Sequence, residues 1–189
     1  MPQPQRGGPS LELDGGALGL LAFVWSGDRY AHHWRFPDEL SEISIQSLES
    51  GSEVTWPVSP PLQQIHRQSF ADGREIVFGV GMAGRGHWSA SFTLVPELRC
   101  WIVELACRAA VMPENLASSY RLAGNWTQLD EHRFGCNRAQ SAMHIEAIAT
   151  SAGGSAELSE GVLRIAPAPV DSTPASTQQW AFKLTLPKN

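Results

Sequence analysis

The chain has few cysteines, few lysines and no long apolar run. Its three cysteines, Cys100, Cys107 and Cys136, are an odd set without a C-x-x-C spacing, which argues against a disulfide framework and a structural zinc site. No window approaches the ~18 consecutive apolar residues of a membrane-spanning helix. Residues 1–10 lack the apolar core of a signal peptide. We therefore expect a reduced, cytoplasmic protein without a membrane partner.

A basic excess is also missing. The 189 residues carry a net charge of -5 with a pI near 5.6, whereas a domain that binds duplex nucleic acid usually replaces counterions with excess Lys and Arg. Nucleic acid is therefore not an expected partner. Among the 14 basic residues, 12 are arginines and 2 are lysines, a bias that fits a GC-rich, bacterial genome.

Known catalytic and cofactor motifs are absent. The Gly-rich segment 79–88 has neither the Gly-Lys-Ser/Thr of a P-loop nor a following helix, which a dinucleotide-binding fingerprint requires. A nucleophile elbow is not found either. We expect no cofactor. The triplet Asn125-Trp126-Thr127 fits the N-glycosylation pattern, which we interpret as chance because no secretory signal precedes it.

What the chain does contain is two-residue alternation of apolar and polar side chains, broken at short intervals by turn residues. Ser26-Gly27 and Asp72-Gly73 predict tight hairpins. The pattern predicts an all-β fold with about 10–12 short strands and little helix: an antiparallel β-sandwich, or a supersandwich or flattened barrel as its variants. The expected strands are 17–25, 28–36, 42–48, 62–70, 74–82, 87–95, 98–109, 118–128, 132–138, 141–150, 156–166 and 178–186.

The domain organisation is simple. Residues 1–9 are rich in Pro and Gly and are expected to be disordered, and 10–189 are expected to form a single sandwich domain with a linker at 167–176. Segment 113–121 could begin a helix but is short, and the helical amphipathicity of 137–149 is the main ambiguity. The predicted core includes Leu20, Phe23, Val24, Ile76, Phe78, Trp88, Phe92, Leu94, Trp101, Val103 and Leu105.

Polar side chains recur at every second position of several predicted strands, which places them on one sheet face. Examples are Arg29, His33 and Arg35; Gln64, His66 and Gln68; His87, Ser89 and Ser91; and Glu104 and Arg108. If the strands within 62–110 are sequential neighbours, His66, His87 and Glu104 are candidates to meet, and a His/Glu set can perform general acid/base catalysis. The competing interpretation is an ordinary solvated sheet face.

The strongest candidate for a ligand site is the Gly-rich segment. Four glycines, at 79, 81, 84 and 86, weaken a strand pair and leave space near Arg85 and His87, while Ser89 and Ser91 extend the row of hydrogen-bonding groups. The alternative is a bulged hairpin turn. For Trp56, in a Pro-rich loop, and for Trp126, the sequence supports core packing and ligand binding equally. No metal site is expected; His144 and Glu146 are weak candidates for two ligands on one strand face.

Two classes of function remain open. The first is a noncatalytic ligand-binding or interaction domain, with carbohydrate as the favoured ligand; the second is a small His/Glu acid–base enzyme acting on a sugar, of an epimerase or mutarotase type. The predicted strand number and polar His/Glu face resemble those of carbohydrate-binding and aldose-epimerase-like sandwiches, an analogy of fold without a shared motif. A small molecule or carbohydrate is thus the expected partner.

Overall fold

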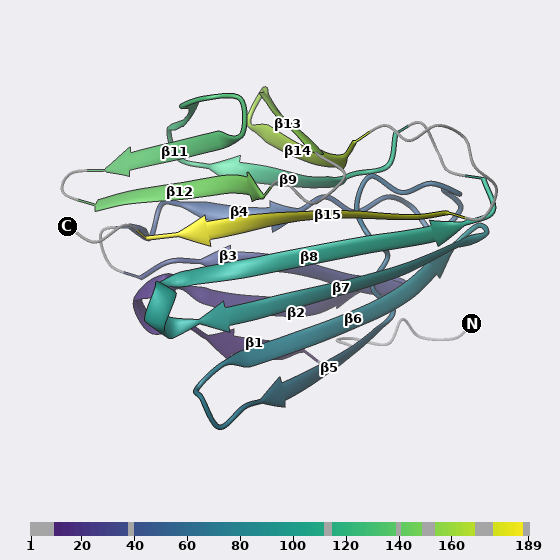
Figure 1. Ribbon diagram of the computed structural model, residues 1–189, viewed down its shortest axis with the longest axis horizontal. Coiled ribbons are helices and arrows are strands. Elements are labelled where there is room, and N and C mark those ends of the chain that lie inside the picture. The colour runs from purple at the N-terminus through teal and green to yellow at the C-terminus, as the bar shows by residue number, and fades with distance from the viewer. Residues whose placement is uncertain are drawn as a thin grey trace, which may run out of the picture.

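The computed structural model describes residues 10–37, 40–111, 115–138, 141–148, 154–168 and 176–186. Two antiparallel sheets of seven and eight strands stack face to face (Figure 1). Helix among these residues is limited to short 3-10 turns, η1 (Gly16–Leu18) and η3 (Pro96–Leu98). The predicted all-β sandwich is confirmed. Residues 1–9, for which disorder was predicted, lie outside the described residues.

The seven-stranded sheet has the strand order β1-β2-β3-β4-β9-β14-β13. Its first four strands follow one another along the chain, and its last three come from two later segments. The strands are β1 (Leu11–Asp14), β2 (Leu20–Ser26), β3 (Arg29–Arg35), β4 (Ser44–Ser47), β9 (Ser118–Ala123), β13 (Gly154–Ser159) and β14 (Val162–Pro167).

The eight-stranded sheet has the order β10-β11-β12-β15-β8-β7-β6-β5. A four-strand meander forms one half, and β15, near the C-terminus, joins this half to a second meander. The strands are β5 (Gln64–Ser69), β6 (Glu75–Ala83), β7 (Gly86–Val95), β8 (Cys100–Ala109), β10 (Trp126–Gln128), β11 (Arg133–Arg138), β12 (Ser141–Ile148) and β15 (Ser176–Thr185).

One long connection, residues 48–63, carries the chain from β4 in one sheet to β5 in the other, and we call it the strap. Backbone bonds fix both of its ends: Leu48 N–H donates to the Ser119 carbonyl (2.9 Å), and Tyr30 N–H donates to the Leu62 carbonyl (2.7 Å). The strap therefore closes the end of the sandwich at which β3 and β7 begin and β8 ends.

Most local expectations are confirmed, since the predicted hairpins form with turns at residues 27–28 and 70–74. Residues 141–148 form a strand, which resolves the helical ambiguity there, and part of 113–121 lies outside the described residues. The strand count was too low because β1 was not predicted, and because 118–128 and 156–166 each contain two strands. In the second case the turn is Glu160-Gly161, with both residues at positive φ.

The core between the sheets is built largely from aromatic rings. Trp34 contacts Trp101 with ring centroids 6.4 Å apart, and Phe23 meets Phe92 edge-on at 5.0 Å. Trp101 is fully buried and donates its indole N–H to the Leu18 carbonyl (2.8 Å). Four of the seven tryptophans, at 34, 88, 101 and 180, are buried, so core filling is the main use of this residue.

Two predicted core residues were wrong: Val24 and Phe78 are exposed by 45% and 40%. Residue Leu20 and residue Ile76 are half-buried. On β2 the apolar run is continuous, so alternation does not show which side faces inward. On β6 the inward positions are Val77, Gly79 and Gly81, so the side chains of Phe78, Val80 and Met82 point outward. None of the helices in the described ranges is long and apolar enough to cross a membrane.

Candidate functional site

The outer face of the eight-stranded sheet carries the polar rows that the sequence predicted. Gln64, His66 and Gln68 lie on one side of β5, and His87, Ser89 and Ser91 lie on the same sheet face of β7. The β7–β8 pairing places Glu104 and Arg108 on this face too, because Ser91 is paired with Glu104 and His87 with Arg108. This face collects the groups that can contact a ligand.

The three candidates for acid/base catalysis share this face but lie apart. The residues His66, Phe78, Ser91 and Glu104 form one row across four strands, so His66 is three strand spacings, roughly 14 Å, from Glu104. Residue His87 lies four positions along β7 from Ser91, a distance of roughly 13 Å. The Glu104 carboxylate instead accepts a hydrogen bond from Ser91 Oγ (2.9 Å). The three side chains thus form no single constellation.

The Gly-rich segment is a regular hairpin. The β6–β7 register runs without interruption from Glu75↔Leu94 to Ala83↔Gly86, so the bulge considered from the sequence is absent. The turn consists of Gly84 and Arg85, with Gly84 at φ +55°, a conformation that favours glycine.

The expectation that these glycines leave open space was wrong, because the strap packs against them. An ideal Cβ on Gly81 would lie 1.7 Å from the Pro61 carbonyl oxygen, and one on Gly79 would lie 3.0 Å from Leu62 Cδ2. Around the turn, Thr55 and Trp56 occupy the corresponding positions against Gly84 and Gly86. The strap occupies the space that side chains at these four positions would otherwise fill.

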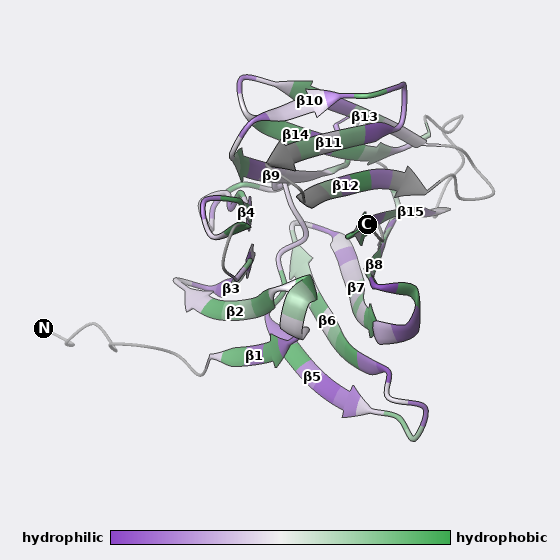
Figure 2. Cartoon of the chain, turned by 90° about the vertical axis from the view of Figure 1, so that its left-hand side faces the viewer, coloured by the Kyte–Doolittle hydropathy of each residue, from purple (hydrophilic) through white to green (hydrophobic). Residues whose placement is uncertain are grey.

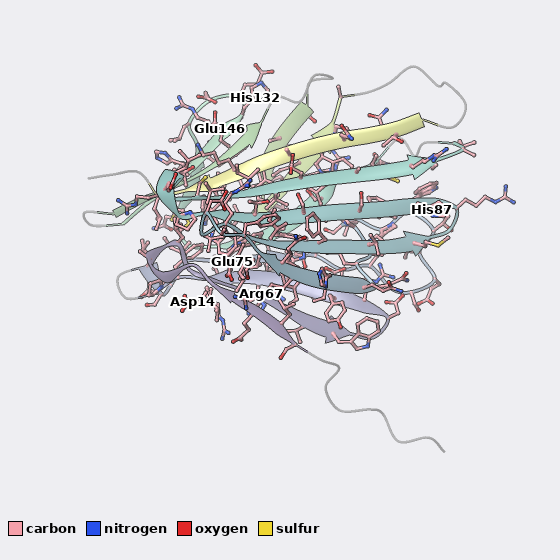
Figure 3. The ribbon with its side chains drawn as sticks, turned by 60° about the horizontal axis from the view of Figure 1, so that its bottom comes forward. Asp14, Arg67, Glu75, His87, His132 and Glu146 are labelled. Carbon is pink, nitrogen blue, oxygen red and sulfur yellow. The ribbon has the colours of Figure 1, made fainter. Side chains whose placement is uncertain are left out.

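At this end of the face, Arg85 lies exposed in the turn and His87 points outward near the start of β7. Figure 3 shows His87 at the end of the sheet far from Glu146. The register pairs His87 with Arg108 on one side and with Met82 on the other. Directly opposite residues have Cβ atoms about 5 Å apart, so His87 and Arg108 are neighbours. The sequence identified Arg108 as polar but did not connect it with this site.

An apolar stripe, Phe78, Val80 and Met82, runs along the outer face of β6. These side chains are exposed by 40, 48 and 50%. In Figure 2 β6 is largely green, whereas β5 beside it is mostly purple. The stripe lies between the polar rows of β5 and β7 and provides apolar surface flanked by hydrogen-bonding groups.

The two tryptophans considered for binding are half-buried and pack against the core. Trp56 lies over Gly86 at the hairpin, and the Trp126 indole donates to the Ala123 carbonyl (2.9 Å). Both rings thus have a structural partner, and neither lies on the outer face between β5 and β8.

The metal candidates His144 and Glu146 share the outer face of β12. Within the described part of the chain, no three His, Cys, Asp or Glu side chains are grouped so that they could hold a metal ion. The register places Glu146 between Arg133 and Lys183, which gives the carboxylate basic neighbours on both sides.

A buried polar cluster beneath the strap was missed by the sequence analysis. Arg29, expected on a polar face, is only 2% exposed and forms a two-bond ion pair with Asp28, through Nε–Oδ1 (2.8 Å) and Nη2–Oδ2 (2.9 Å). These hydrogen bonds hold the pKa of Asp28 below its ordinary value. Arg29 Nη1 is buried without a hydrogen-bond partner among the described residues.

Glu49 is the second charged member of this cluster. Its Oε1 accepts a hydrogen bond from Ser47 Oγ (2.6 Å), and its Oε2 is buried with no hydrogen-bond partner in the described ranges. Burial raises the pKa of Glu49, although the Ser47 hydrogen bond and the charge of Arg29 both act in the opposite direction.

The cluster ends in the core at His32 and Tyr120. The backbone N–H of His32 donates to Ser47 Oγ (2.9 Å), and its ring Nε2 lies 3.3 Å from the Tyr120 hydroxyl. Burial lowers the pKa of His32 to about 3, so this imidazole is neutral at physiological pH, and burial raises the pKa of Tyr120. His32 also packs against Phe92, with ring centroids 4.7 Å apart. Ser47 links these groups to Glu49 of the strap, because its Oγ accepts from His32 and donates to Glu49.

No protein-family model matches this chain, and no curated protein is significantly similar to it in sequence. A function is therefore inferred from the chain's own surfaces. Chemically, the outer face offers apolar contact on β6, donors and acceptors on β5 and β7, and three basic groups at one end. The cluster around Arg29 and His32 is buried and offers little surface to a ligand.

Proposed function

We propose that this domain is a noncatalytic binding module that uses the outer face of β5–β8, with carbohydrate as its ligand class. The observation that carries the proposal is the exposed stripe of Phe78, Val80 and Met82 between two rows of hydrogen-bonding side chains. An exposed apolar patch rimmed by polar groups marks an interaction site in many proteins. A sugar ring has the complementary surface: an apolar C–H face and a rim of hydroxyls.

The polar rows suit such a ligand. The amides of Gln64 and Gln68 on β5 both donate and accept hydrogen bonds, and so do the hydroxyls of Ser89 and Ser91 on β7. Because the rows flank the stripe at strand spacing, a ring stacked on β6 lies within reach of both. The separation of His66, His87 and Glu104 favours binding over the alternative of a His/Glu enzyme acting on a sugar.

The proposed setting is a bacterial cytoplasm, without nucleic acid as a partner. Cys100, Cys107 and Cys136 are all buried, and Cys100 and Cys107 are free thiols, which fits a reducing compartment. Burial raises the pKa of Cys107 to about 11, so this thiol is unreactive at neutral pH. The net charge of -5 disfavours nonspecific binding to nucleic acid.

The test is binding of the full chain to a panel of immobilised neutral and acidic polysaccharides, followed by titration calorimetry with the best oligosaccharide. The double variant Phe78→Ala/Val80→Ser should weaken binding at least about tenfold, because it removes the apolar contact of roughly two side chains. Val24→Ser is the matched control, since Val24 is exposed by 45% on the other sheet. Equal effects of the two variants, or no saccharide bound by the parent, would overturn the proposal.

A further inference from the structure

Three basic groups gather at one end of the outer face, and we call Arg85, His87 and Arg108 the basic end. Arg85 occupies the β6–β7 turn, and His87 and Arg108 are directly paired across β7 and β8. Residues Arg85, His87 and Arg108 are all exposed. Two guanidinium groups and an imidazole therefore lie at the same end of β6, β7 and β8.

The two rows of side chains nearest to this end contain no carboxylate. The last row is Met82, His87, Arg108 and Thr177, and the next is Gln64, Val80, Ser89, Ala106 and Gln179. On β7 and β8 the nearest acidic side chain of this face is Glu104, which is hydrogen-bonded to Ser91.

Arg85 and Arg108 also lack ion-pair partners across the described ranges. By contrast, Arg29, Arg74 and Arg133 each pair with an aspartate. Like Arg85 and Arg108, Arg121 on the other sheet has no ion pair among the described residues. A chain of net charge -5 thus leaves both guanidinium groups at this end of the sheet without an ion-pair partner in the described ranges. A free guanidinium fork matches the geometry of a carboxylate or sulfate and binds it through two parallel hydrogen bonds.

We propose that the basic end recognises the anionic group of an acidic polysaccharide, a sugar chain bearing carboxylates or sulfates. This inference rests on the proposed function and specifies its ligand. The apolar stripe reaches the basic end directly, since Met82 is paired with His87. A sugar ring stacked on Val80 and Met82 places its acidic substituent beside His87 and Arg108, and Arg85 approaches the same group from the turn.

The experiment compares ligands that differ only in charge. Polygalacturonate is titrated against its methyl ester, and dextran sulfate against dextran, with the full chain at low and high salt. We expect at least one charged polymer to bind about tenfold or more tightly than its neutral counterpart, and high salt to reduce the difference. The carboxylate and sulfate arms show which anion is preferred.

Variants locate the effect. Arg85→Gln and Arg108→Gln should each weaken binding of the preferred charged polymer about tenfold and leave binding of its neutral counterpart unchanged. Arg121→Gln, an exposed arginine on β9 of the other sheet, is the matched control. Unfolding midpoints equal to the parent's confirm that the variants are folded.

The possible failures are distinguishable. Equal binding of charged and neutral polymers, lost in Phe78→Ala/Val80→Ser but not in the arginine variants, would overturn the anionic inference and support the proposed function. Binding of duplex DNA or of anionic lipid vesicles in place of every saccharide would overturn both. Charge-selective binding that Arg121→Gln reduces as much as Arg108→Gln would place the anion site elsewhere and overturn this inference alone.

Discussion

The contact between β6 and the strap makes Gly81→Ala a sharp test of the fold. A Cβ at this position would lie 1.7 Å from the Pro61 carbonyl oxygen, whereas ordinary contacts begin near 3.4 Å. Backbone must therefore move by more than 1 Å. The movement strains two bonds beside it, from Gln63 N–H to the Val80 carbonyl (2.8 Å) and from Met82 N–H to Gln63 Oε1 (3.0 Å).

The expected cost follows from these contacts. Overpacking typically costs about 1–3 kcal/mol, and two weakened hydrogen bonds add roughly 0.5–1.5 kcal/mol each. The higher conformational entropy of unfolded glycine returns roughly 0.5–1 kcal/mol to the variant. We expect Gly81→Ala to lower the free energy of unfolding by about 2–4 kcal/mol, measured by urea denaturation followed through tryptophan fluorescence.

Gly79→Ala is the matched control on the same strand and the same face. Its Cβ would meet the Leu62 side chain at 3.0 Å rather than a backbone carbonyl, and side-chain methyl groups can rotate away. The loss should therefore stay below about 1 kcal/mol. If both variants lose the same stability, or if Gly81→Ala lies within about 0.5 kcal/mol of the parent, the strap does not pack as described.

Two further predictions concern the core and the buried cluster. Trp101→Ala should cost about 3–5 kcal/mol of unfolding free energy in urea titrations because the ring is fully buried; a loss below about 1 kcal/mol would contradict this. Burial raises the pKa of Glu49 in the folded chain, so the folded chain binds this proton more tightly than the unfolded chain does. The resulting stabilisation is complete below pH 4.5, the ordinary pKa of the group, and is lost as the pH rises through the native pKa. Glu49→Gln should therefore gain stability relative to the parent as the pH of such titrations rises above 4.5. Asp28→Asn should show the opposite pH dependence. Because the pKa of Asp28 is lowered, its ionised carboxylate stabilises the folded chain above pH 3.8, and this stabilisation is lost as the pH falls through the native pKa. Parallel stability curves for parent and variants would refute both assignments.

The hairpins were predictable because their causes are local. A turn such as Ala71–Arg74 places Asp72 and Gly73 where a tight connection needs them, and the flanking alternation then fixes which residues share a face. The polar rows of β5 and β7 follow from the same two rules. The relation of His87 to Arg108 was not predictable, since the connection between β7 and β8 includes a 3-10 turn whose length sets the register.

The face of β6 was assigned incorrectly for a physical reason. Large apolar residues at 76, 78, 80 and 82 have the spacing of a core face, but the inward positions are Val77, which is fully buried, and two glycines, at 79 and 81. Those glycines are needed because Pro61 and Leu62, which lie more than 15 residues away in sequence, occupy the space. Alternation within one strand contains no information about a distant segment that packs on it.

The strap links the two regions that the sequence analysis treated separately. Near its start, Glu49 accepts a hydrogen bond from Ser47 and extends the buried cluster around Arg29. Farther along the strap, Thr55, Trp56 and Pro61 lie against the glycines of the β6–β7 hairpin. The hairpin in turn holds Arg85 and His87. A change that loosens the strap therefore disturbs the basic end without altering any residue on the outer face. Stability at the buried cluster and geometry at the proposed anion site are thus connected by one segment, which is why binding measurements on strap variants must be read together with their unfolding free energies.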